Sequence, residues 1–260
     1  MIKESSDPDD GAWFALTASQ YVEREGGADW RGLRSSCTAS THPRCRFRPR
    51  PAKAGRDCAG VGREARQHIS DVATRLFAQR GFEAVTVMEI AEAAGVAKAT
   101  VTNYFPHKED LLLDLQTVAE KLLVDALRNR PPGQPVVEAV RGLMHRLLAQ
   151  RHPLSTAAPG MAKFGRLIAE SPALLSRARE QRECLESAVA RQLSEETGDP
   201  VRADLVARLL LAAVTTVVVS SIRRLIAGEP ASTVATDQRQ VIDEAFDLLT
   251  DGIGTFGSST

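Results

Sequence analysis

The sequence predicts an all-α protein with a small N-terminal helical domain and a larger C-terminal helical domain. Three observations support this fold class. Beyond residue 62, apolar residues recur at the three- and four-residue spacing of amphipathic helices. The apolar segments are separated by helix-ending signals such as Ser171-Pro172 and Gly198-Asp199-Pro200. No alternating run of apolar and polar residues bounded by turn residues predicts a strand.

The composition is that of an ordinary globular protein. Of the 260 residues, 43% are hydrophobic and 25% are charged, which excludes collagen-like, wholly disordered and multi-span membrane proteins. The most apolar run, Leu209 to Val219, has 11 residues, whereas a membrane span needs about 20. The first thirty residues lack the basic start and apolar core of a signal peptide. We therefore expect a cytoplasmic protein without a membrane partner.

The four cysteines indicate neither a disulfide framework nor a metal centre. Three of them, Cys37, Cys45 and Cys58, lie in a basic, Pro-containing stretch, and Cys184 lies far downstream. No C-x-x-C pair occurs, and zinc ligands usually come in close pairs. We therefore expect reduced thiols, no metal and no cofactor; a metal site that includes His42 is the weaker alternative.

Charge is unevenly distributed in the first quarter of the chain. Residues 1–30 contain seven acidic and two basic side chains, and residues 42–66 contain eight basic and two acidic ones. The run RCRFRPRPAKAGR resists packing because Pro removes hydrogen-bond donors and like charges repel. We expect residues 1–60 to be a disordered, basic and Pro-rich extension. The alternative is that the natural chain starts later, for instance at Val61.

Helical signals begin after this extension. The first helix has one apolar face and closes at Gly81, a typical C-terminal cap. Thr86 and Glu89 form a capping box that opens a second helix. A third short helix is expected over about 98–105, and a fourth over about 108–128. Further helices are expected at about 135–151, 160–170, 172–197, 200–227 and 237–255.

The segment Val87–Phe105, VMEIAEAAGVAKATVTNYF, has the features of a helix-turn-helix. Ala91 is a small residue where the two helices touch, and Gly95 tolerates the positive φ of the turn. Four apolar anchors hold the second helix: Ile90, Val96, Val101 and Phe105. The outer face of that helix carries polar side chains that suit base edges and phosphates: Lys98, Thr100, Thr102, Asn103 and Tyr104.

The stretch GFEAVTVMEIAEAAGVAKATVTNYFPHKEDLLLD resembles the DNA-binding domain of the tetracycline-repressor (TetR) family of bacterial transcription regulators. The resemblance covers residues 63–113, and the remainder matches in length and helical character. It implies a helix-turn-helix DNA-binding domain over 61–110 and an effector-binding and dimerisation domain over 111–257. It also implies a set of DNA-contacting residues: Thr86, Lys98, Ala99, Thr100, Thr102, Asn103, Tyr104 and Lys108.

Two positions depart from the family pattern. Many members carry Ser or Thr where this chain has Ala97, and many carry Tyr where it has Thr102. Residues 63–110 contain six basic and seven acidic side chains, whereas phosphate neutralisation supplies much of the affinity of DNA-binding proteins. We therefore hypothesise that the Arg-rich arm, residues 44–56, adds phosphate or minor-groove contacts. The alternative is an extension without a role.

The last two helices, 200–227 and 237–255, are expected to form a homodimer. The apolar stripe of helix 200–227 is too broad for one buried face, so part of it is available to a partner. In the family, the corresponding pair forms a four-helix interface, and a two-fold dimer suits a palindromic double-stranded operator. The alternative is that both helices fill the core of a monomer.

The resemblance further implies an effector pocket among the helices between residues 111 and 197. The candidate lining residues are Leu115, Val118, Leu122, Met144, Met161, Phe164 and Leu167. The alternative for each is a place in the core. Because Phe164 is the one aromatic residue in this set, the lining favours an aliphatic or flexible apolar effector over a planar polycyclic cation.

These observations predict a ligand-responsive transcription regulator, a repressor that a small apolar effector releases from its operator. The downstream helices show no converging carboxylates and no nucleophile with a base, so no catalytic residue is predicted and no enzyme is expected. Two alternatives stay open. One is a helical cofactor-binding protein or enzyme that retains a helix-turn-helix, and the other is a helical adaptor that no longer binds DNA.

Overall fold

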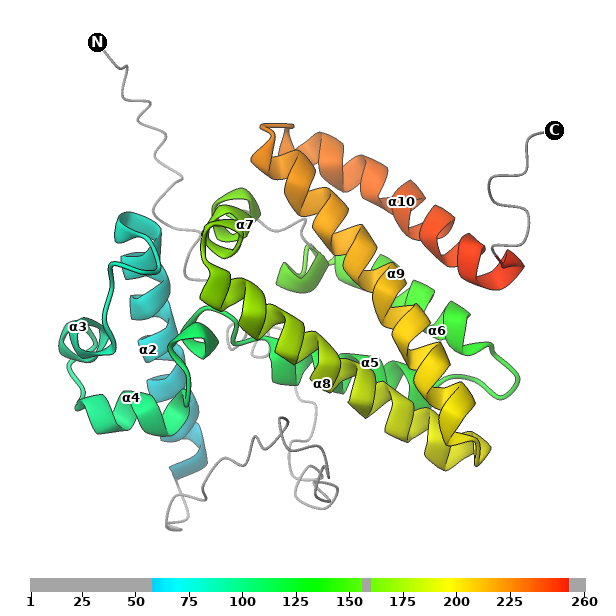
Figure 1. Ribbon diagram of the computed structural model, residues 1–260, viewed down its shortest axis with the longest axis horizontal. Coiled ribbons are helices and arrows are strands. Elements are labelled where there is room, and N and C mark those ends of the chain that lie inside the picture. Colours follow the sequence, from blue (N-terminus) through cyan, green and yellow to red (C-terminus); the bar gives the residue numbers. More distant parts are fainter. Residues whose placement is uncertain (1–57, 156–159, 253–260) are drawn as a thin grey trace. The chain divides into compact units, whose positions relative to one another are not determined.

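The computed structural model describes residues 58–155 and 160–252, and every regular element in these ranges is a helix (Figure 1). The predicted all-α fold class is therefore confirmed. The chain divides into two compact units, unit 1 (Met1–Asp114) and unit 2 (Leu115–Thr260). This division falls slightly after the boundary that the sequence predicts at residue 110. The predicted disordered extension lies outside the described residues apart from its last three, which begin the first helix.

Unit 1 contains the helix-turn-helix. Its elements are α2 (Cys58–Arg80), α3 (Val87–Ala93), α4 (Lys98–Tyr104) and the short 3-10 helix η3 (Lys108–Leu111). Their packed side chains are almost fully buried, and the most enclosed are Ile69, Ala73, Phe77, Val85, Ile90 and Val101. The Phe77 and Phe82 rings lie 4.9 Å apart between centroids, which closes the corner between α2 and α3. This core holds α3 and α4 in a fixed relation.

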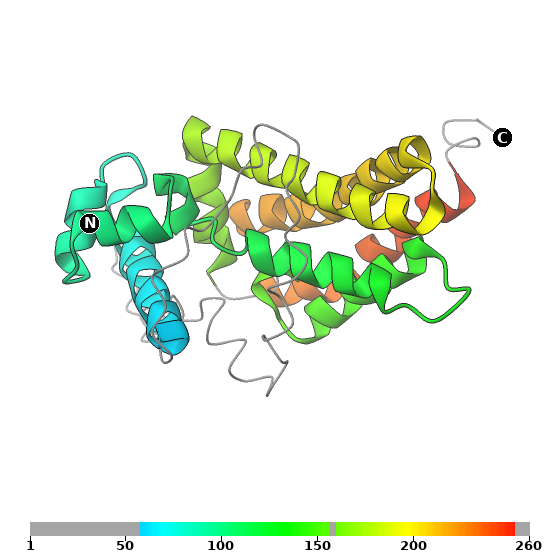
Figure 2. The same cartoon turned by 90° about the horizontal axis from the view of Figure 1, so that it is seen from below.

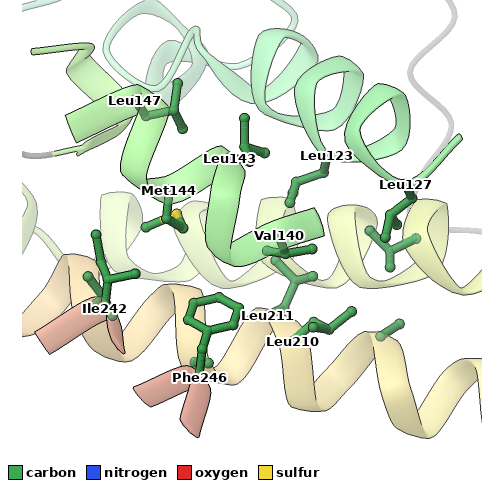
Figure 3. Close-up of a cluster of buried hydrophobic side chains, with 14 of the residues drawn as sticks. Leu123, Leu127, Val140, Leu143, Met144, Leu147, Leu210, Leu211, Ile242 and Phe246 are labelled. Atoms are coloured by element: carbon green, nitrogen blue, oxygen red, sulfur yellow. The ribbon is translucent and has the colours of Figure 1, made fainter. Parts of the chain in front are cut away.

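The described residues of unit 2, 115–155 and 160–252, form a bundle of six α-helices and one short 3-10 helix. They are α5 (Gln116–Arg128), α6 (Val136–Ala149), η4 (Pro153–Ser155), α7 (Met161–Glu170), α8 (Pro172–Thr197), α9 (Pro200–Ile226) and α10 (Ala231–Asp251). The long helix α8 packs along both α9 and α5 (Figure 2). A buried cluster contributed by α5, α6, α8, α9 and α10 forms the core, and Phe246, Ile242 and Leu210 are among its most buried side chains (Figure 3).

Two of the expected helix boundaries are wrong. The fourth helix, expected over about 108–128, is two elements, η3 and α5, separated by Leu112–Leu115. The Ser70 hydroxyl of α2 donates to the Leu111 carbonyl (3.2 Å) and to the Asp114 carboxylate (3.1 Å). Leu111 and Leu112 are both buried. The Leu111 carbonyl thus accepts a hydrogen bond from α2. In a continuous helix it would accept one from the backbone N–H four residues later.

The last helix begins at Ala231, not near residue 237, and ends at Asp251. Pro230 occupies its N-cap, and Val234 is 2% exposed, so the first turn is anchored in the bundle. Arg224 of α9 pairs with both Glu229 and Asp237, each at 2.6 Å, and these ion pairs hold the turn between α9 and α10. The earlier start is therefore a product of tertiary contacts.

In the described part of the chain, one helix, α9, is long and apolar enough by composition to cross a membrane, with a mean hydropathy of 2.1 over its most apolar window. It packs against α7, α8 and α10, and it carries charged residues near both ends, such as Arg208 and Arg224. Only 28% of that apolar window is buried within this chain. This helix is therefore one member of the bundle, and most of its apolar window is not buried within this chain.

Candidate nucleic-acid interface

The entrance to α3 is a complete capping box. The Thr86 hydroxyl accepts from the Glu89 backbone N–H at 3.2 Å, and the Thr86 backbone N–H donates to the Glu89 carboxylate at 2.7 Å. Arg80 of α2 pairs with the same carboxylate at 2.7 Å. These bonds lower the pKa of Glu89 from 4.5 to about 2. The predicted cap is confirmed, and a phosphate contact by the exposed Thr86 stays a prediction.

The turn between α3 and α4 has the predicted geometry. Gly95 has φ of 67°, a left-handed conformation that costs glycine nothing. The Val96 backbone N–H donates to the Ala91 carbonyl at 2.9 Å, and Ala91 is 1% exposed. A larger side chain at Ala91 would separate the two helices. The turn therefore aims α4 relative to α3, as a helix-turn-helix requires.

Four residues of α4 form its outward face, which we call the α4 face: Lys98, Ala99, Thr102 and Asn103. All four are exposed, whereas Val101 on the opposite side is fully buried. Successive helix residues turn by about 100°, so these four cover one continuous arc of about 140°. Ala97 caps α4 with no side-chain hydrogen bond, as the sequence predicts.

Two predicted contact residues, Thr100 and Tyr104, lie outside this face. Both are half-buried on the flank of α4. The Tyr104 hydroxyl lies next to Gly62 of α2, where an added Cβ would stand 3.5 Å from the oxygen. By the same 100° step, Thr100 lies about 60° beyond Asn103 and borders the α4 face, whereas Tyr104 lies about 100° beyond Asn103, on the side of α4 that contacts α2. Their DNA contacts stay predictions.

Lys108 is held within unit 1. Its ammonium group donates to the Phe82 carbonyl at 2.6 Å and lies 4.2 Å from the centroid of the Phe82 ring. Burial lowers the pKa of Lys108. The family resemblance implies a DNA contact for Lys108 and does not predict this contact inside unit 1. The aromatic pair Phe77 and Phe82, close to one cation in the same domain, was the available signal.

A second cation and a buried acid also escaped the sequence analysis. The Arg66 guanidinium stacks 4.6 Å over the Phe105 ring that ends α4. Burial raises the pKa of the Asp114 carboxyl, while Arg66 and the Ser70 hydroxyl act in the opposite direction. Arg66 and Asp114 thus make contacts inside unit 1, with Phe105 and with Ser70, and neither residue belongs to the α4 face.

Two family models match this chain. Residues 69–115 match the model described as bacterial regulatory proteins, tetR family, and residues 134–254 match the model described as the MftR C-terminal domain. Together they cover both units. The chain belongs to the TetR family.

Curated relatives of this TetR-family protein are named as regulators. It is 35% identical over 85 residues to the HTH-type transcriptional regulator AcrR of Shigella flexneri, a match covering 32% of this chain and 40% of AcrR. It is 28% identical over 153 residues to the HTH-type transcriptional regulator TcmR of Streptomyces glaucescens, covering 58% of this chain and 68% of TcmR. The AcrR match thus spans less than half of that relative.

Among solved structures, the TetR-family repressor FadR of Thermus thermophilus, in complex with lauroyl-CoA, is 26% identical to this chain. The superposition covers 75% of this chain and 98% of FadR, with a TM-score of 0.45.

The predicted effector-binding residues of this TetR-family protein have two kinds of position in unit 2. Met144 and Leu167 are buried, at 2% and 8% exposed, and Met144 belongs to the core cluster (Figure 3). The others are half-buried: Leu115, Val118, Leu122, Met161 and Phe164. Two hollows in unit 2 are lined by other residues, one of about 640 Å³ beside Arg130 and Glu196 and one of about 490 Å³ along α9. Met144 is therefore a residue of the hydrophobic core, which was the alternative to a place in the effector pocket.

Two histidines of unit 2, His145 and His152, have structural partners. His152 is 2% exposed, its Nδ1 accepts from the Leu154 backbone N–H at 3.1 Å, and burial lowers its pKa to about 4. His145 contacts Asp243 at 2.8 Å, which joins α6 to α10. Within the described ranges, no group of three or more His, Cys, Asp or Glu side chains could hold a metal ion.

Proposed function

We propose that this TetR-family protein is a DNA-binding transcription regulator of the bacterial cytoplasm, a repressor that a small apolar effector releases from its operator. One observation carries the proposal. The helix-turn-helix presents a solvent-exposed face with one cation, two hydrogen-bonding side chains and no acidic residue on α4. Such a face fits the major groove, where base edges offer donors and acceptors between rows of phosphates.

The proposed functional unit is a homodimer. Val201, Leu205 and Leu209 are 79%, 57% and 46% exposed on α9, and Leu248 on α10 is 44% exposed. At four-residue intervals, the three residues of α9 share one side of that helix. A second copy of the chain would cover them and place two copies of α4 on a palindromic operator. This arrangement supports an interface through α9 and α10.

The proposed effector site lies in unit 2 among α5, α7 and α8. Val118, Leu122, Met161 and Phe164 are apolar and half-buried, so they can take up a ligand without losing the core. The chain passes between the two units at Asp114 and Leu115, where the expected helix is interrupted. A ligand that binds one arrangement of unit 2 more tightly would shift the operator affinity through this connection.

We also propose that the protein is not an enzyme. The buried carboxylate of Glu186 pairs with Arg182 at 2.7 Å and with Arg208 at 3.3 Å, as in a structural ion-pair network. A screen of the purified chain for hydrolase activity and bound cofactors tests the alternative of an enzyme.

The deciding experiment is a gel shift with the full chain and duplexes from the DNA flanking its own gene, at about 50 and about 200 mM salt. Specific retention that weakens with salt is expected. Lys98→Ala should weaken binding and lower the salt slope by about one if Lys98 contacts a phosphate. Lys163→Ala, the same change on an exposed residue of α7, is the matched control. If no duplex is retained at low salt, the proposal is wrong.

A further inference from the structure

We propose that the α4 face reads A·T base pairs, so that the core of each operator half-site consists of A·T pairs and guanine is contacted only from the Lys98 end. This inference rests on the proposed function, in which α4 enters a major groove. It concerns which bases are recognised, whereas the proposed function concerns whether DNA is bound.

The order of side chains around α4 defines what the face can contact. With about 100° per residue, the arc runs Lys98, Thr102, Ala99, Asn103. The ammonium group is at one edge, the amide is at the other, and two side chains with methyl groups lie between them. The centre of the face is therefore the least polar part.

The Thr102 hydroxyl has limited capacity toward DNA. Its Oγ1 lies 3.3 Å from the Lys98 carbonyl and 3.2 Å from the Ala99 carbonyl, and it donates to them within the helix. While its single proton is directed at these carbonyls, the oxygen accepts hydrogen bonds from outside, and donation to O6 or N7 of guanine would give up the bond within the helix. The oxygen can accept from the amino group of adenine or of cytosine. The γ-methyl group favours the A·T pair, because it can contact the C5-methyl of thymine.

Ala99 and Asn103, the next residues around the α4 face, also favour A·T base pairs. Ala99 contributes a methyl group, which suits the C5-methyl of thymine. Asn103 contributes an amide that donates and accepts at once, the pattern that pairs with N7 and the amino group of adenine. A G·C pair offers neither the thymine methyl nor the adenine pattern. Three of the four residues therefore favour A·T pairs.

Lys98 is the exception in this set. Its ammonium group has three donors and no acceptor, so it fits O6 and N7 of guanine or a phosphate. No acidic residue occurs in α4, so the usual acceptors for the cytosine amino group are missing. Any guanine contact is thus restricted to the edge of the half-site that faces Lys98.

The test starts with selection of binding sites by the full chain from a random duplex library. A palindrome with A·T half-site cores is expected. Replacing contacted thymines by uracil removes only the C5-methyl and should weaken binding about fourfold per position, from about 0.8 kcal/mol for one buried methyl group. The variant Thr102→Ser lacks the γ-methyl group and keeps the hydroxyl, so it should abolish this effect at one thymine.

The adenine contact is tested separately. Asn103→Ala should weaken binding to the selected site by about 5- to 150-fold, and Asn103→Gln should restore part of it because Gln can form the same pair of bonds. Asn129→Ala, at the exposed C-cap of α5, is the matched control and should change nothing. Circular dichroism checks that the variants keep their helices.

The outcomes separate this inference from the proposed function. A selected site with a G·C core, or affinity unaffected by uracil substitution and by Asn103→Ala, overturns the A·T readout while DNA binding stands. If the full chain retains no duplex at low salt, the proposed function fails and the readout fails with it.

Discussion

Gly165 lies where α7 and α9 of unit 2 approach closely. A Cβ added at this residue of α7 would lie 2.4 Å from Ile222 Cγ2 and 3.2 Å from Ile226 Cδ1 on α9. Overpacking of this kind costs about 1–3 kcal/mol, against about 0.5–1 kcal/mol gained when Ala replaces a helical glycine. We expect Gly165→Ala to lower the free energy of unfolding by about 1 kcal/mol, measured by urea denaturation.

The matched control is Gly142→Ala in α6. There the added Cβ would be 3.4 Å from Nη1 of Arg146, the end of a flexible side chain. The propensity gain should dominate, and the variant should be more stable than the native chain by about 0.5–1 kcal/mol. Equal effects of the two substitutions would contradict the close approach of α7 and α9.

Glu89 links the stability of unit 1 to pH. Its pKa in the folded protein is about 2, against 4.5 ordinarily, because of the bonds from Thr86 and Arg80. A lowered carboxyl pKa stabilises the fold above pH 4.5, and the contribution is lost as the pH falls toward 2. The difference in Tm between the native chain and Glu89→Gln should therefore be largest near neutral pH and vanish near pH 2.

The control for this titration is Glu92→Gln, on the exposed side of the same helix. Because Glu89 is half-buried and its carboxylate is accessible to solvent, salt should reduce the effect. Thermal melts of the three proteins between about pH 2 and pH 7 provide the comparison. A Tm difference between Glu89→Gln and the native chain that is constant over this range would show that the carboxylate is not held by the cap.

At the scale of helices, α4 begins without a side-chain cap. Ala97 already has the extended backbone of an N-cap, with φ of −69° and ψ of 146°. A hydroxyl there could accept from a free N–H of the first turn, which is worth about 1 kcal/mol. Ala97→Ser should therefore raise the free energy of unfolding in denaturant titration.

Ala99→Ser is the control for the cap. It places the same hydroxyl inside α4, where Ser is a slightly poorer helix former than Ala. It should be neutral or slightly destabilising. If both substitutions stabilised the protein alike, the gain would not come from capping.

The exposed side of α9 provides a test of the proposed dimer. Leu209 is 46% exposed, so Leu209→Glu leaves the core of the bundle intact. Two buried carboxylates facing each other across a two-fold interface would be strongly unfavourable. The variant should elute as a monomer in size-exclusion chromatography with light scattering, while Ser176→Glu on the exposed side of α8 should not change the mass. A native chain that is itself monomeric would refute the proposed interface.

Helix interiors and caps were predictable from the sequence, whereas two helix boundaries were not. The Thr86 cap and the Gly95 turn depend on hydrogen bonds between residues no more than five apart in sequence, so the local pattern identifies them. The break after Leu111 depends on Ser70, which is 41 residues away. The early start of α10 depends in part on Arg224 in another helix. Local patterns carry no information on such contacts.

At the scale of the whole molecule, the Arg-rich arm, residues 44–56, is the segment that we expect to add positive charge for phosphate contacts. It contains six basic residues and no acidic one, and its structure lies outside the described residues. Replacing all six by Gln keeps the chain length. If the arm neutralises phosphates, the slope of log affinity against log salt should fall by about 0.9 for each phosphate that the variant leaves without a cation. A scrambled arm of the same charge should keep the slope, and an unchanged slope in the Gln variant would mean that the arm has no role.

The sequence by itself determined the fold class, the family, the cap at Thr86, the turn at Gly95 and the polar character of α4. Each of these follows from spacing or from residues that are neighbours along the chain. Only the tertiary structure decided that Lys108 contacts Phe82, that Thr100 and Tyr104 are half-buried, and that Met144 belongs to the core. The reason is physical: whether a side chain is free or engaged depends on surfaces brought together by packing between distant segments.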